Sequence, residues 1–257
     1  MTDTSIKTAL ITGSARRIGR ALALGLAADG WAVALHHHQA SDDADKLADT
    51  INSGGGRAVT VAADLADEIQ AVGLITQAVE KIGPLTCLIN NASLFEEDTV
   101  VTATRHSWDA HMQVNLRAPF VLIQGFAEQL ATGAGQGNVI NIIDQRVWNL
   151  PPTFTSYTLS KAGLWTLTQT LAQALAPDIR INAIGPGPVL PSARQTDAAF
   201  REQWSSLPLP RRIEPEEIVD AARYILQARS LTGQMIAVDG GQHLGWAQAT
   251  KDKNQGE

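Results

Sequence analysis

The chain has 257 residues, of which 44% are hydrophobic and 18% are charged. This composition is ordinary for a globular protein with a sizeable core, and the length fits one large α/β domain. A net charge of -6 without a basic block argues against nucleic acid as a partner. The single cysteine, Cys87, excludes an intramolecular disulfide and a cysteine metal site, and its apolar surroundings predict a buried strand thiol.

The N-terminal residues 1–7 are polar and lack the apolar core of a secretory signal. No apolar stretch of the sequence is long enough, and free enough of charge, to span a bilayer. We therefore expect a cytoplasmic protein without a membrane segment.

Short apolar runs alternate with amphipathic stretches along most of the chain. The runs predict strands at 7–12, 32–36, 58–62, 85–89, 139–143, 179–184 and 235–238. The amphipathic stretches predict helices at 17–29, 41–53, 68–81, 108–130, 156–175 and 215–227. Ser41 is the expected N-cap of the second helix. Residues 186–212 predict a long loop, and residues 247–257 predict a polar tail.

Seven apolar strands that alternate with helices predict an α/β fold, with a seven-stranded parallel sheet and helices on both faces. The turn between the first strand and the first helix contains Gly13 and Gly19, which is typical of the doubly wound, dinucleotide-binding Rossmann fold. No linker or repeat divides the sequence, so we expect residues 1–257 to form a single domain.

The segment from Gly13 to Gly19 predicts a phosphate-binding turn. Glycine allows a sharp turn and a close approach of the backbone, while free N–H groups at the helix start face the anion. The spacing of the glycines differs from G-x-G-x-x-G, so the spacing alone is a weak signal. The prediction depends on the place of this segment, directly after the first predicted strand. Gly13, Arg17, Ile18 and Gly19 are therefore candidate dinucleotide-binding residues.

The end of the second predicted strand favours NADP(H) over NAD(H). Sites specific for NAD have an Asp or Glu there to bind the ribose 2′-hydroxyl, and this chain has His36, His37 and His38 instead. We expect Arg17 to supply a cation near the 2′-phosphate, with Ser41 as a further contact. Adjacent histidines on an extended strand point to alternate sides, so no metal site is predicted.

Further candidate cofactor residues lie where the predicted strands end, because open α/β sheets bind ligands at the carboxyl ends of their strands. Asp64 follows the third strand and is a candidate acceptor for the adenine amine. The other candidates at strand ends are His36, His38, Leu65, Asn91, Ala92, Ser93, Pro186 and Gly187.

Tyr157 and Lys161 are four residues apart on one predicted helix and therefore share a face. A free tyrosine has a pKa near ~10. A nearby ammonium group stabilises the phenolate and lowers that pKa toward neutrality, which suits a proton donor or acceptor. The alternative is a surface pair that arose by chance.

Four motifs occur in order along the chain: T-G-x-x-x-x-x-G at 12–19, N-N-A at 90–92, Y-x-x-x-K at 157–161 and P-G at 186–187. Together they resemble the short-chain dehydrogenase/reductase family. The resemblance implies that Tyr157 is the general acid or base and that Lys161 lowers its pKa and holds the nicotinamide ribose. It also implies that Asn115 supports a proton relay, and that the protein is a homo-oligomer, which we expect to be a tetramer formed through the long helices and residues 238–241.

Asp144 departs from this family, which usually has serine at this position. An ionised aspartate only accepts hydrogen bonds, so it suits an N–H group of a nitrogen heterocycle, or a proton-delivery pair with Tyr157. The substitution resembles the pteridine and dihydromonapterin reductases, as do T-G-x-x-x-R-x-G at 12–19, L-H-H-H at 35–38 and N-N-A-S-x-F at 90–95. Those relatives often have Arg-Ser after the histidines, where this chain has Gln39 and Ala40. The alternative for Asp144 is a structural acid that caps a loop.

This resemblance implies a pterin-like substrate bound by Ser93, Phe95, Asp144 and Tyr157, with Phe95 stacked on the flat ring. Loop packing is the alternative role for Phe95. Residues 188–210 are the expected lid, in which Trp204 helps to exclude water from the substrate.

We therefore predict an NADPH-dependent enzyme that reduces a dihydropterin or dihydrofolate by hydride transfer, with protonation by Tyr157. One alternative is a reductase of a ketone, aldehyde or quinone. The other is a non-catalytic sensor that binds a dinucleotide.

Overall fold

The computed structural model describes residues 7–132, 135–192 and 194–245. Its strands are β1 (Thr8–Ile11), β2 (Ala32–His37), β3 (Arg57–Ala62), β4 (Cys87–Asn90), β5 (Gly137–Ile142), β6 (Ile179–Pro186) and β7 (Met235–Val238). They form one parallel sheet in the order β3-β2-β1-β4-β5-β6-β7. The strand order reverses between β1 and β4, which confirms the predicted doubly wound fold.

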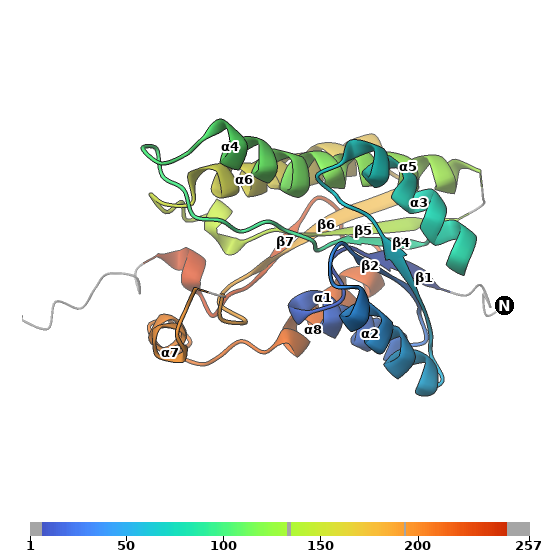
Figure 1. Cartoon of the computed structure of the whole chain (residues 1–257), viewed down its shortest axis with the longest axis horizontal. Helices are drawn as coiled ribbons and strands as arrows, with labels where there is room; N and C mark the ends of the chain where they lie inside the picture. The colour runs from blue at the N-terminus through green and yellow to red at the C-terminus, as the bar shows by residue number, and fades with distance from the viewer. Residues whose placement is uncertain (1–6, 133–134, 193, 246–257) are drawn as a thin grey trace, which may run out of the picture.

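Helices cover both faces of the sheet (Figure 1). One face carries α3 (Glu68–Ile82), α4 (Arg105–Met112), α5 (Ala118–Ala131) and α6 (Thr155–Ala174). The other face carries α1 (Arg17–Ala28), α2 (Ser41–Ser53) and α8 (Pro215–Gln227). The remaining helix α7 (Asp197–Ser205) and the 3₁₀ turns η2 (Gln145–Val147) and η3 (Gln242–Leu244) lie in connecting segments.

The core consists of two apolar layers, one on each face of the sheet. Leu22, Leu26 and Ile218 belong to the layer under α1 and α8, whereas Leu74 and Phe126 belong to the layer under α3 and α5. Strands buried on both faces read as continuous apolar runs, which is why the sequence identified them so directly. Cys87 is fully buried in β4, as predicted.

The prediction of one continuous helix over residues 108–130 is wrong. The helical segment begins earlier, at Arg105, where Thr104 and Ser107 form a capping box. A π-helical segment, η1 (Gln113–Arg117), then separates α4 from α5. A π turn holds an extra residue and so rotates the side chains on either side of it, which the 3.6-residue period of the sequence does not reveal.

The expected loop 186–212 is wrong in part, because it contains α7. Thr196 caps this helix by accepting a hydrogen bond from the N–H of Ala199, and Asp197 stands in its first turn. Ser41 is not the N-cap of α2, since Ser41 itself is helical and Ala40 holds that position. The predicted tail 247–257 lies outside the described residues, and no helix within them is long and apolar enough to cross a membrane.

Replacing Phe126 with alanine should strongly destabilise the fold. The side chain is fully buried between α5 and the sheet, so its removal leaves a cavity that costs about 3–5 kcal/mol in the free energy of unfolding. Urea denaturation at a fixed protein concentration measures this loss. Ile69→Ala, at a residue that is 85% exposed on α3, is the matched control and should change stability by less than about 0.5 kcal/mol. Equal losses for the two variants would contradict the assignment of Phe126 to the core.

Candidate active site

A cavity of about 550 Å³ follows the carboxyl ends of the strands, where the predicted site residues were expected to meet. The predicted residues that line it are Gly13, Arg17, Ile18, Gly19, His36, His38, Asp64, Leu65, Asn91, Ala92, Ser93, Phe95, Asp144, Tyr157, Lys161, Pro186 and Gly187. Three predicted residues do not line it: Ser41, Asn115 and Trp204. The sequence therefore identified most of one contiguous site, although its members come from the whole length of the chain.

The glycine turn is held in place by neighbouring strand ends. Gly13 has a φ of +61°, and its N–H donates to Nδ1 of His36 at 3.0 Å. A Cβ at Gly19 would lie 2.3 Å from the carbonyl oxygen of Gly13, so only glycine fits there. The side-chain amide of Asn91 donates to the carbonyl oxygens of Thr12 and Gly13 at 2.8 and 3.1 Å.

His36 supports the turn from beneath and is 2% exposed. Its Nε2 lies 3.1 Å from the carbonyl oxygen of Ala63, so this nitrogen carries the proton and Nδ1 is free to accept from Gly13. Burial lowers the pKa of His36 to about 4, which keeps the imidazole neutral at physiological pH.

Arg17 lines the cavity, but its side chain has an unexpected set of partners, and its predicted contact with a 2′-phosphate stays a prediction. Its guanidinium donates to the carbonyl oxygens of Leu190 and Pro191 at 3.1 and 2.8 Å and so joins the glycine turn to the segment after β6. Sequence reasoning did not select Arg16, the residue before α1. Its side chain reaches the start of α2 and forms an ion pair with Asp43 there. Arg17 has a φ of +55°, which is unusual for a residue other than glycine. At this turn the side chains of Arg16 and Arg17 contact different segments, α2 and residues 190–191.

Tyr157, Asp144 and Lys161 are brought together as predicted. The Tyr157 hydroxyl donates to Oδ2 of Asp144 at 3.1 Å, and Nζ of Lys161 donates to the carbonyl oxygen of Ile142 at 2.8 Å. Tyr157 is 5% exposed and Lys161 is 2% exposed. Both buried side chains come from α6, whereas Asp144 follows β5, so the site combines a helix face with a strand end.

The electrostatics differ from the expectation that Lys161 lowers the pKa of Tyr157. Burial and the Asp144 carboxylate raise the pKa of Tyr157 well above its ordinary value, whereas the charge of Arg146 lowers it. Burial also lowers the pKa of Lys161 to about 8, so its ammonium form still predominates at neutral pH. Tyr157 is therefore protonated over the physiological range and can serve as a proton donor.

Arg146 is a member of the site that sequence reasoning missed. Its Nε donates to Oδ2 of Asp144 at 3.1 Å, and its backbone N–H donates to Oδ1 at 2.9 Å. The second bond caps η2, so Asp144 is a loop cap as well as a cavity residue. An acid two residues before an arginine at a turn is the one sequence signal for this pair, and it is a common pattern on protein surfaces.

Aromatic rings form a wall beside Tyr157. Phe95 stacks on Phe154 with ring centroids 4.6 Å apart, and it meets the Tyr157 ring edge-on at 4.7 Å. Phe154 was also missed by sequence reasoning, and it lines an adjoining cavity of about 400 Å³ together with Arg146 and Arg194. Phe95 borders both cavities, so its ring packs in the loop and also faces the site.

Asn115 supports the site from behind the cavity. From η1, its side chain accepts from the N–H of Leu94 at 2.8 Å and from Ser93 Oγ at 3.2 Å, and it donates to the Leu94 carbonyl oxygen and to Ser160 Oγ at 2.9 and 3.1 Å. These contacts hold the segment after β4 against α6. The relay role implied for Asn115 stays a prediction.

A buried polar network ties the Phe95 segment to the start of α6. Asp98 accepts hydrogen bonds from the N–H and the hydroxyl of Ser156, the residue before Tyr157. Ser156 Oγ lies 2.7 Å from Nδ1 of His111, whose Nε2 accepts from the N–H of Glu96. Because Nε2 accepts, Nδ1 carries the proton, and every member of the chain of hydrogen bonds is satisfied.

Two predicted contact residues, Ser41 and Trp204, do not line the cavity, for reasons that lie in the local structure. Ser41 sits inside the first turn of α2, away from the cavity, because that helix begins one residue earlier than a Ser41 cap would require. Trp204 lies on α7 and packs against the core layer beneath α1, whereas its neighbour Gln203 faces the smaller cavity. Adjacent residues on a helix point about 100° apart, so only one of them can face the site.

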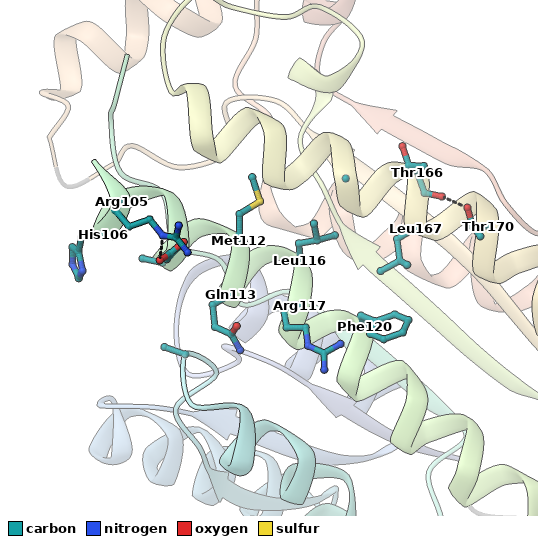
Figure 2. Close-up of a pocket in the computed structure, with 14 residues that line it drawn as sticks. Arg105, His106, Met112, Gln113, Leu116, Arg117, Phe120, Thr166, Leu167 and Thr170 are labelled. Atoms are coloured by element: carbon teal, nitrogen blue, oxygen red, sulfur yellow. Dashed lines mark hydrogen bonds and ion pairs between the residues drawn. The ribbon is translucent and has the colours of Figure 1, made fainter. Parts of the chain in front are cut away.

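A larger hollow, of about 1380 Å³, lies away from the strand ends, between α4, η1 and α5 on one side and α6 on the other. Figure 2 shows the apolar side chains of Met112, Leu116, Phe120 and Leu167 in it, with Arg117 between Leu116 and Phe120 and with Arg105 beside His106. It contains none of the catalytic candidates, so its size does not make it the active site.

Two solved structures of FolM alternative dihydrofolate reductase 1, each in complex with NADP, are similar to the chain. The Brucella canis protein is 49% identical, with a TM-score of 0.91, and covers 96% of this chain and 97% of its own. The Brucella suis protein is 50% identical, with a TM-score of 0.90 over 93% of this chain and 96% of its own. The 3-oxoacyl-[acyl-carrier-protein] reductase of Synechocystis sp. is 31% identical over 94% of this chain and 98% of its own length.

Residues 13–243 match the family described as Enoyl-(Acyl carrier protein) reductase. That match spans both the glycine turn after β1 and the Tyr157–Lys161 pair on α6. The chain therefore belongs to the short-chain dehydrogenase/reductase family and is an oxidoreductase of that family.

Proposed function

We propose that this protein is an NADPH-dependent reductase of pteridines, of the dihydropterin or dihydrofolate type. The observation that carries the proposal is the Asp144 carboxylate, which lies in the cavity and accepts a hydrogen bond from the Tyr157 hydroxyl. A carboxylate binds N–H donors and rejects carbonyl oxygens, so this position favours a ring that bears amine and ring N–H groups. The similarity to two proteins named alternative dihydrofolate reductase supports the same substrate class.

The residues at the strand ends fit a dinucleotide. The cradle at Gly13 and Gly19 has no room for a side chain at Gly19, and it lies at the N-terminus of α1, where free N–H groups attract phosphate. β2 ends in histidines, without the acid that would bind a ribose 2′-hydroxyl. Arg16 and His38 line the cavity at this strand end and would supply hydrogen-bond donors to a 2′-phosphate. NADP in both FolM structures agrees with this preference.

The reaction requires a hydride at a ring carbon and a proton at the adjacent nitrogen. NADPH supplies the hydride when it is bound. Tyr157 is the proposed proton donor, because its hydroxyl is protonated at neutral pH and lies in the cavity. Lys161 is the proposed cation that steadies the negative charge left on Tyr157, and Asp144 orients the hydroxyl through their hydrogen bond.

Phe95 and the segment after β6 would enclose the substrate. The Phe95 ring borders the cavity and offers a flat apolar surface to a flat heterocycle, with Ser93 two residues before it. Residues 188–210 are the proposed lid, and Arg194 connects this segment to the Phe95 carbonyl oxygen and to Glu96. These contacts link the position of the lid to the ring that would stack on the substrate.

A second candidate function is the reduction of a simple carbonyl substrate. The relative named 3-oxoacyl-[acyl-carrier-protein] reductase favours it. The Asp144 carboxylate argues against it, because a carbonyl oxygen needs a donor where this chain has an acceptor. A non-catalytic sensor is less well supported, since Tyr157 and Lys161 are both present and both line the cavity.

A substrate panel tests the proposed function. Purified protein is assayed with NADPH and with NADH against dihydrobiopterin, dihydromonapterin, dihydrofolate and several ketones, aldehydes and quinones. We expect kcat/KM for a dihydropterin or dihydrofolate to exceed that for the carbonyls by roughly tenfold or more, since buried polar groups reject unmatched substrates. NADPH should be preferred over NADH by roughly tenfold or more, because of charge-assisted contacts to the 2′-phosphate.

Each part of the proposal has its own contradicting result in this panel. Faster reduction of carbonyls would favour the second candidate function, and equal use of NADH would overturn the cofactor preference. Tight NADPH binding without turnover of any compound would favour the sensor.

Asp144→Ser should change the substrate preference. Loss of a charge-assisted hydrogen bond should lower kcat/KM for the pteridine by roughly 10- to 100-fold, while carbonyl turnover holds or improves. Asp64→Ser, which removes another carboxylate from the same cavity, is the matched control and should alter the KM for NADPH but not the ratio of pteridine to carbonyl turnover. Pteridine reduction by Asp144→Ser at the wild-type rate would refute the role of the carboxylate.

We also propose that the protein is a cytoplasmic homotetramer, with the hollow of Figure 2 covered by a second copy of the chain. Half-buried apolar residues, Met112, Leu116, Phe120 and Leu167, line the hollow together with arginine side chains, and apolar residues and arginine are enriched at subunit interfaces. Its helices are the long helices from which the family resemblance implies oligomer contacts.

Light scattering coupled to size-exclusion chromatography tests the assembly. The wild-type protein should have the mass of four chains of 27.4 kDa each. Leu167→Glu puts a charge in the hollow and should reduce the mass, because an unpaired buried charge is strongly unfavourable. Val72→Glu, at an exposed residue of α3 outside the hollow, is the control and should leave the mass unchanged. A monomeric wild-type protein would contradict the proposal.

A further inference from the structure

Arg146 contacts the same carboxylate oxygen as the proposed proton donor. Oδ2 of Asp144 accepts from the Tyr157 hydroxyl at 3.1 Å and from Nε of Arg146 at 3.1 Å. The guanidinium carbon also lies 5.1 Å from the centroid of the Tyr157 ring. The side chains of Arg146 and Asp144 are each 17% exposed, so water screens this pair only in part.

A carboxylate beside a buried phenol opposes the release of the phenol proton. The product of that release would be a phenolate next to a second negative charge, in surroundings that already disfavour charge. The serine usual at this position in the family brings no such charge. A chain with Asp144 therefore needs a compensating cation if Tyr157 is to donate its proton readily.

We propose that Arg146 is a positioning residue for the proposed reaction, and that its guanidinium neutralises the Asp144 carboxylate and thereby keeps Tyr157 able to release its proton. This inference rests on the proposed role of Tyr157 as proton donor. It does not rest on the pteridine specificity, because the same balance of charges governs protonation of any substrate at this hydroxyl.

Other charged groups around Tyr157 are less well placed to neutralise the Asp144 carboxylate. Lys161 of α6 has its Nζ 5.9 Å from the ring centroid and donates to a backbone carbonyl oxygen of β5. His111 of α4 meets the ring edge-on at 6.0 Å, and burial lowers its pKa, so it is mostly neutral at physiological pH. Arg194 of the lid stacks over Phe95 at 5.6 Å and pairs with Glu96.

Arg146 also packs against the rings of Phe95 and Phe154, at 5.3 and 5.1 Å from their centroids. A purely structural role in this aromatic wall is therefore the competing explanation. The two roles differ in a measurable way, because packing alone leaves the proton affinity of Tyr157 unchanged.

Arg146→Met tests the inference by removing the charge while keeping an unbranched apolar stem. The pH profile of kcat is measured with NADPH and the best substrate of the panel. Loss of a cation near the phenol should raise the pKa of Tyr157 further, so the fall in kcat at high pH that reports Tyr157 should move to higher pH. The fall set by Lys161, whose pKa is about 8, should stay in place. The plateau of kcat should fall by roughly three- to tenfold, because Tyr157 becomes a weaker acid. Arg146→Lys retains a charge and should restore most of the wild-type pH profile.

Arg194→Met is the matched control, because it removes a cation from the same ring stack without touching Asp144 or Tyr157. This variant should change KM, because Arg194 connects the lid to the Phe95 segment, and it should leave the alkaline side of the pH profile of kcat unchanged. The double variant Asp144→Ser with Arg146→Met removes both charges. The pH at which its kcat falls on the alkaline side should therefore lie close to that of Asp144→Ser alone and below that of Arg146→Met. An alkaline fall in kcat that stays fixed in Arg146→Met, or that moves equally in Arg194→Met, would overturn the proposal.

A readout that needs no turnover separates this inference from the proposed function. The chain has two tyrosines, and Tyr224→Phe leaves Tyr157 as the only one. Its ionisation is then followed by ultraviolet difference absorbance in the NADP complex. The midpoint should rise in Arg146→Met and fall in Asp144→Ser, and identical midpoints would refute the inference even in an active enzyme. Thermal unfolding and NADPH binding confirm that each variant is folded. If Arg146→Met does not fold, Arg146→Gln removes the same charge while keeping a polar side chain beside Asp144, and the Tyr157 midpoint should rise in it in the same way.

Discussion

All seven strands run in one direction, and this constraint determines where the chemistry of the protein can take place. Parallel strands end at the same edge of the sheet, so the segments after β1, β2, β4, β5 and β6 meet there although they are far apart in the sequence. The reversal of strand order between β1 and β4 opens the space that these segments surround. The glycine turn, the histidine strand end and Asp144 therefore line one cavity. α6 then packs across the neighbouring face and brings Tyr157 and Lys161 to it.

Within that cavity, charged and aromatic groups gather around Tyr157. Tyr157 is buried beside a carboxylate, an arrangement that holds the proton on the phenol and places a hydrogen-bond acceptor in the cavity. Arg146 pairs with the same carboxylate, and Phe95 and Phe154 enclose the group on its apolar side. In the two proposals, substrate preference and proton transfer would both depend on Asp144, which connects the pteridine proposal to the proposal for Arg146.

The sequence predicted what depends on local pattern. Buried parallel strands produce continuous apolar runs, and the Tyr157–Lys161 spacing places both side chains on one helix face regardless of tertiary packing. It did not predict features that depend on contacts distant in sequence. The π turn at Asn115, the contact of Arg17 with residues 190–191 and the stack of Phe154 on Phe95 all depend on how segments pack together. The errors at Ser41 and Trp204 arose where a helix boundary or a helix face decides which way one side chain points.

The most direct test of this account is the crystal structure of the protein with NADP and a dihydropterin bound together. The account predicts that the pterin lies flat against Phe95 and that its N–H groups donate to the Asp144 carboxylate. It also predicts that the Tyr157 hydroxyl is within hydrogen-bonding distance of the ring nitrogen that receives the proton. A pterin bound elsewhere, or one bound here with its carbonyl oxygen toward Tyr157 and no N–H contact to Asp144, would contradict it.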